Sequence, residues 1–122
     1  MLLPFLMQKQ RRLLKSKDFK NVRTYGRSWT DRNVVLVAKR RDHEFAPSCS
    51  RFGFVVSKRI GNSVVRNRFK RCLKESARQM IVRDGWDIVF IARNNKSLGF
   101  CEIHDSVRNL LVKSGLMQRI NV

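Results

Sequence analysis

The side chains best suited to chemistry lie between Lys58 and Arg78, where basic residues dominate. Eight of these 21 residues are Lys or Arg and Glu75 is the single acid, so the segment carries a net charge of +7. Guanidinium and ammonium groups bind phosphate, and the forked donors of Arg also suit base edges. Because a solvated helix face usually mixes both signs of charge, this segment predicts a binding site for a polyanion.

Three polyanions could supply the complementary charge: chromatin, a membrane surface or structured RNA. The whole chain has a net charge of +18, which is spread over the N-terminal segment, the loop 57–63 and the helix that follows. Such a spread suits a large folded RNA, and Asn67 between Arg66 and Arg68 adds hydrogen-bonding groups that suit bases. A membrane-surface helix would need its apolar residues for lipid, but here the core needs them. RNA is therefore favoured, with no DNA or membrane partner.

Catalytic chemistry in the polypeptide is not indicated. The nine acids are scattered, with no spaced cluster that would hold two metal ions. Asp42, His43 and Glu44 are adjacent in a loop-like stretch, whereas catalytic triads are defined by geometry rather than by adjacency. We expect no catalytic residue and no metal ligand in this chain.

From the cysteines and the apolar runs of the chain we expect a cytoplasmic domain. Cys49, Cys72 and Cys101 are odd in number and form no C-x-x-C pair, so neither a disulfide nor a zinc site is expected. No apolar run approaches the length that spans a bilayer. We expect a single RNA-binding domain over 1–122, in which 1–11 is a flexible segment.

Hydrophobic periodicity predicts the elements that position the basic residues. Helices are predicted from Ser16 up to a stop at Gly26, at 63–83 and at 102–113, and strands at 34–38, 51–57 and 87–93. The buried stripe of the middle helix is predicted to contain Val65, Phe69, Cys72, Leu73, Ser76 and Met80. On the second strand Phe52 and Phe54 are expected in the core, so the face with Gly53 and Val55 is the better candidate for a nucleic-acid cleft.

The run Val55–Arg71, VVSKRIGNSVVRNRFKR, closely resembles the signature of bacterial ribonuclease P protein subunits. Further matches are Arg12-Leu13, Lys17-Asp18-Phe19, Gly26, Arg51–Phe54 and Asp87–Arg93, so the resemblance spans about residues 12–111. It implies an α+β, sandwich-like fold in which a single mixed four-stranded sheet packs with three helices in the order α-β-β-β-α-β-α. It also implies a left-handed β-α-β crossover at the helix with Arg66, Asn67 and Arg68, an exception to the usual right-handed rule.

The resemblance implies a subunit of an endoribonuclease whose catalysis resides in its RNA. Such a protein joins the catalytic RNA, binds the 5′ leader of precursor tRNA and promotes productive binding of metal and substrate. Mg²⁺ would be held mainly by the RNA, and the protein alone would be inactive. The alternatives are a non-catalytic RNA-binding protein of the ribosomal type and a protein-only nuclease.

Site residues follow by matching positions to the family pattern. The expected contacts to catalytic RNA are Lys58, Arg59, Asn62, Arg66, Asn67, Arg68 and Arg71. The expected contacts to the precursor-tRNA leader are Phe19, Arg23, Val37, Lys70 and Lys74. Arg23 and Val37 stand where the family usually has aromatic residues, so leader binding here is expected to rely more on phosphate contacts.

Overall fold

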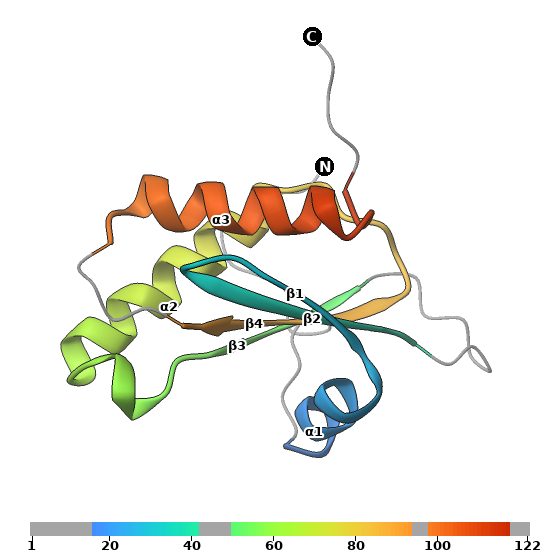
Figure 1. Cartoon of the computed structure of the whole chain (residues 1–122), viewed down its shortest axis with the longest axis horizontal. Helices are drawn as coiled ribbons and strands as arrows, with labels where there is room; N and C mark the ends of the chain where they lie inside the picture. The colour runs from blue at the N-terminus through green and yellow to red at the C-terminus, as the bar shows by residue number, and fades with distance from the viewer. Residues whose placement is uncertain (1–15, 42–49, 94–97, 118–122) are drawn as a thin grey trace, which may run out of the picture.

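The computed structural model describes residues 16–41, 50–93 and 98–117. The predicted segment 1–11, the Arg12-Leu13 match, Cys49 and the Asp42–His43–Glu44 trio lie outside these residues. The described helices are α1 (Ser16–Tyr25), the short 3₁₀ helix η2 (Lys58–Ile60), α2 (Ser63–Arg78) and α3 (Phe100–Lys113) (Figure 1). The strands are β1 (Arg27–Thr30), β2 (Val34–Arg40), β3 (Arg51–Val55) and β4 (Trp86–Ala92).

The four strands form one mixed sheet in the order β1-β2-β4-β3. β2 pairs antiparallel with both β1 and β4, while β3 and β4 pair in parallel. A parallel pair needs a long crossover, and α2 lies in that connection. The predicted α+β class, element order and single mixed sheet are confirmed, while the left-handed crossover stays a prediction.

The main core lies between the sheet and the pair α2 and α3 (Figure 1). Phe52 and Phe54 of β3 are 2% and 9% exposed, which confirms their predicted place in this core. The ring of Phe54 stacks on that of Phe90 in β4, with ring centroids 6.0 Å apart. Burying each such ring contributes about 1.5–3 kcal/mol, so this face holds much of the stability.

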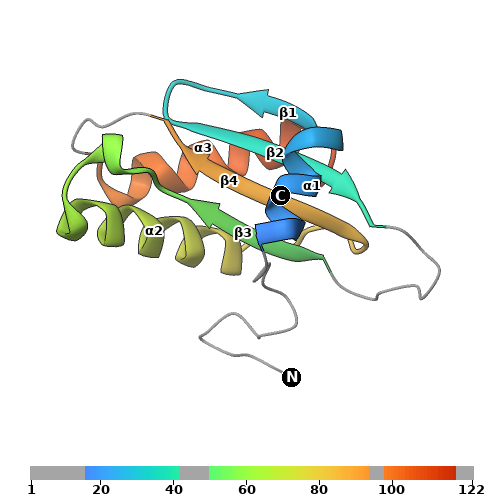
Figure 2. The ribbon, with the colours of Figure 1, turned by 90° about the horizontal axis from the view of Figure 1, so that it is seen from below.

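The opposite face of the sheet carries α1 (Figures 1 and 2). Val22 of α1 is fully buried against Val37 and Val89, in a second and smaller core. The helix ends before Gly26, as predicted, and the Gly26 amide donates to the Val22 carbonyl at 2.7 Å. The backbone approaches β2 so closely that a Cβ at Gly26 would lie 2.7 Å from the Ala38 carbonyl oxygen.

Several predicted boundaries are wrong for local reasons. α2 ends at Arg78 rather than at residue 83, since the amides of Gln79 and Met80 close a turn onto the carbonyls of Ser76 and Ala77. Strand β3 stops at Val55 because Ser57 already leads into η2.

Two further details differ from prediction, the start of α3 and the burial of Val65. α3 begins at Phe100 rather than at Glu102, because the Glu102 carboxylate accepts the Gly99 amide at 2.7 Å and so caps the first turn. Val65 in the first turn of α2 is 39% exposed rather than buried, since its side chain packs over the Gly61 backbone instead of the sheet. No helix in the described ranges is long and apolar enough to cross a bilayer.

Candidate nucleic-acid interface

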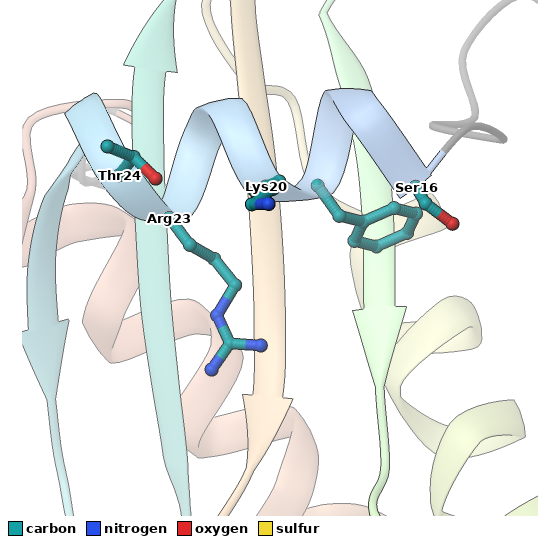
Figure 3. A pocket seen from close by; sticks show the side chains of 5 residues that line it. Ser16, Lys20, Arg23 and Thr24 are labelled. Atoms are coloured by element: carbon teal, nitrogen blue, oxygen red, sulfur yellow. The ribbon is translucent and has the colours of Figure 1, made fainter.

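A hollow of about 420 Å³ lies along α1. Its lining residues are Ser16, Phe19, Lys20, Arg23 and Thr24. Phe19 and Lys20 follow Ser16 by three and four residues, and Arg23 and Thr24 follow Lys20 by three and four, so these residues share one side of the helix. Figure 3 shows Arg23 extending from α1 over the sheet. This surface, called the α1 hollow below, combines an aromatic ring, two cations and two hydroxyls.

The sheet beside the α1 hollow presents an apolar floor. Val35, Ile91 and Val55 are paired across β2, β4 and β3, and all three are partly buried. They pack in the same small core as Phe19. The next row contains Val37, which is 7% exposed because α1 packs over it. Little of the Val37 side chain is therefore left to contact a nucleotide directly.

A chain of ion pairs connects α1 to the sheet at the other end of β3. Arg51 donates two hydrogen bonds to Asp87, from Nε at 2.9 Å and from Nη2 at 2.8 Å. Its Nη1 lies 3.8 Å from Asp18 of α1, and Arg41 lies 3.6 Å from Asp87. Asp87 is 5% exposed, so this carboxylate depends on its two arginines for compensation.

Three residues of the signature hold the start of α2 and the loop before it. Asn62 is the N-cap of α2, and its Oδ1 accepts the Val65 amide at 3.0 Å. Arg66 folds back so that its Nε donates to the Gly61 carbonyl at 3.2 Å. Arg68 reaches the other way and donates to the Leu98 carbonyl at 2.9 Å, which ties α2 to the segment entering α3. These three side chains hold the start of α2 in place as well as adding charge to it.

The cations of η2 and α2 up to Lys74 are here called the basic surface. It consists of Lys58, Arg59, Arg66, Arg68, Lys70, Arg71 and Lys74. Lys58, Arg59, Arg68 and Arg71 are exposed, as is Asn67, while the other cations are partly buried. Figure 2 shows α2 projecting beyond the β3 edge, so this helix is also visible from the α1 side.

Glu75 is the one acid within this run, and it is engaged by its own helix. Its carboxylate accepts hydrogen bonds from Arg78 and Gln79. The hydrogen bond from Arg78, followed by that from Gln79, lowers the pKa of Glu75 below its ordinary value of 4.5. Arg78 is thus partly neutralised, and the charge of the basic surface comes from the seven cations that precede it.

The structure separates the predicted site residues into two groups. Phe19 and Arg23 lie in the α1 hollow, whose lining residues all come from α1, whereas Lys70 and Lys74 lie on α2. Ser16, Lys20 and Thr24 were not predicted, although their helical spacing from Phe19 and Arg23 could have indicated them. Within 16–41, 50–93 and 98–117, no three His, Cys, Asp or Glu residues come together as a metal site.

The fold and these surfaces define a basic α+β protein built to bind a polyanion. The family model described as Ribonuclease P matches residues 7–115. The chain therefore belongs to the ribonuclease P protein family, as its signature predicts. This assignment does not favour the ribosomal-type alternative.

Individual relatives agree with this assignment. The ribonuclease P protein component of Clostridium kluyveri is 42% identical over 112 residues, covering 86% of this chain and 95% of its own length. That of Oceanobacillus iheyensis is 35% identical over 116 residues, covering 92% of this chain and 93% of its own.

Solved structures show the same fold. The RNase P protein of Staphylococcus aureus matches with a TM-score of 0.77 at 28% identity, covering 88% of this chain and 98% of that one. The RNase P protein of Thermotoga maritima matches with a TM-score of 0.73 at 27% identity, covering 84% and 96%.

Proposed function

We propose that the chain, as the protein subunit of ribonuclease P, holds two RNAs on two surfaces. The basic surface binds the catalytic RNA, except for Lys70 and Lys74. These two lysines and the α1 hollow bind the 5′ leader of precursor tRNA. The complex works in the cytoplasm, where the catalytic RNA removes the leader and the protein alone is inactive. Mg²⁺ is assigned to the RNA, whose phosphate oxygens are the ligands that this ion prefers.

The observation that carries the leader assignment is the composition of the α1 hollow. A single strand is held by cations that follow its phosphates and by aromatic rings that stack on its bases. Lys20 and Arg23 supply the cations and Phe19 supplies the ring, all on one helix face. Base stacking on one ring is worth about 1–3 kcal/mol and tolerates any sequence, as a varied leader requires.

The proposal that the basic surface binds the catalytic RNA rests on the charge and the exposure of its side chains. Lys58, Arg59, Arg68 and Arg71 are exposed around the start and outer side of α2. Each phosphate that such a side chain neutralises releases counterions and strengthens binding at low salt. Asn62 and Arg66 contribute by fixing the loop that presents Lys58 and Arg59.

A crosslinking experiment separates the two surfaces. A photoreactive amino acid is placed at position 19 in the α1 hollow, at 71 on the basic surface, or at 108 on the outer side of α3 as the control. In the assembled holoenzyme with precursor tRNA, position 19 is expected to crosslink to the leader and position 71 to the catalytic RNA. Crosslinks from position 71 to the leader, or from position 19 to catalytic RNA alone, would contradict the assignment.

A further inference from the structure

We propose that Arg51 is a positioning residue that sets the place of α1, and with it the α1 hollow, on the sheet. The inference rests on the proposed function, because it concerns the surface assigned to the leader. Arg51 bonds Asp87 of β4 through two nitrogens, and its third nitrogen lies 3.8 Å from Asp18 of α1. One guanidinium thus joins three elements.

The geometry makes α1 depend on this contact. Val22 is the buried residue of α1, so the helix has a small apolar footprint on the sheet. Its C-terminal end is fixed at Gly26, where the backbone meets Val22 and Ala38. Asp18 lies two turns earlier, near the other end, so its pairing with Arg51 fixes the direction in which α1 crosses the sheet.

The charges of Asp87 and Asp18 also indicate that α1 depends on Arg51. Asp87 is 5% exposed, and Asp18 has 26% of its side chain exposed beside a surface assigned to phosphates. Removing the guanidinium would leave Asp18 without this partner, and Asp87 with only the 3.6 Å contact to Arg41. Their negative charge would push α1 away from the sheet and would also repel a bound strand. Arg51 therefore orders the helix and neutralises its acids without touching the leader itself.

The test compares Arg51→Met and Asp18→Asn with Arg108→Met, which removes one positive charge from the outer side of α3. Amide hydrogen exchange reports the order of α1, and the affinity ratio of holoenzyme for precursor over mature tRNA reports leader binding. Both site variants should raise exchange in α1 while exchange in α2 stays unchanged. Arg51→Met should lower the affinity ratio by about tenfold, within the range for interacting charges. The Arg108→Met control should change neither reading.

The second variant keeps the test decisive if Arg51→Met fails to fold, because Asp18→Asn leaves the pairing of Arg51 with Asp87 intact. If a folded variant shows the same amide hydrogen exchange in α1 as the wild type, the positioning role of Arg51 is overturned, whatever the affinity for the leader. Faster exchange with an unchanged affinity ratio would support the positioning of α1 by Arg51 but would contradict leader binding in the α1 hollow. In Arg51→Lys, which keeps the charge but loses the fork, intermediate values of both readings would support the role.

Discussion

Gly26→Ala tests whether the α1 hollow depends on close packing of α1 against β2. An added Cβ would lie 2.5 Å from the Val22 carbonyl oxygen and 2.7 Å from that of Ala38. An ordinary contact begins at 3.4 Å, so the two gaps fall short by 0.9 Å and 0.7 Å (3.4 − 2.5 and 3.4 − 2.7). Both obstacles are backbone atoms that cannot rotate away, so α1 must move.

The expected cost follows from that movement. Overpacking at a rigid site destabilises a fold by about 1–3 kcal/mol. If the leader can bind only when α1 returns to its place, the same energy reduces leader affinity by about 5- to 150-fold. Urea unfolding measures the first quantity. The affinity ratio of reconstituted holoenzyme for precursor over mature tRNA measures the second, because mature tRNA lacks the leader.

Gly99→Ala is the matched control. At this position a Cβ would meet the Glu102 carboxylate at 3.5 Å, an ordinary contact, and α3 lies on the other face of the sheet. Gly99→Ala should lower the free energy of unfolding by less than about 1 kcal/mol, as loss of a favourable N-cap residue does. If Gly26→Ala is as stable as the wild type and keeps the full affinity ratio, the account of how α1 is held is refuted.

Three further predictions concern single side chains. Arg23→Phe should make the slope of log leader affinity against log salt shallower by about 0.7, the loss of one single-strand phosphate contact, while Arg108→Phe should leave the slope unchanged. Asn62→Ala should lower the free energy of unfolding by about 1 kcal/mol through loss of the N-cap, while Asn62→Ser should restore most of it; equal losses in both variants would contradict the capping role. Glu75→Gln should destabilise the protein at neutral pH, since the lowered pKa of Glu75 means that its charged form is favoured by folding. The difference in melting temperature between Glu75→Gln and wild type should therefore shrink as the pH falls below 4.5, and a constant difference would contradict the pairing with Arg78.

The sequence predicted the parts of the fold that carry strong local patterns. The buried side of α2 could be predicted because Phe69, Leu73 and Ser76 recur at helical spacing. All three are buried in the structure. Phe52 and Phe54 alternate on β3 and were assigned correctly to the core. In these elements the local pattern and the tertiary environment favour the same structure.

Other features depend on contacts between distant residues. β1 reads Arg-Ser-Trp-Thr with no apolar alternation, and it exists because it pairs with β2. The burial of Val37 follows from α1 lying over β2, a packing choice that the single buried residue of α1 does not reveal. The link from Arg51 to Asp87 joins residues 36 apart and needs the parallel register of β3 and β4. Periodicity within one element cannot show any of these.

The most direct test of the central claim, that this protein supports RNA catalysis without performing it, is reconstitution of precursor-tRNA cleavage at low Mg²⁺. The protein and a bacterial ribonuclease P RNA are assayed separately and together. The account predicts 5′ leader removal with both present and none with the protein alone, and assembly weakened by combined alanine substitution of Arg66 and Arg68. Cleavage by protein free of RNA, or no restoration of cleavage when the two are combined, would contradict it.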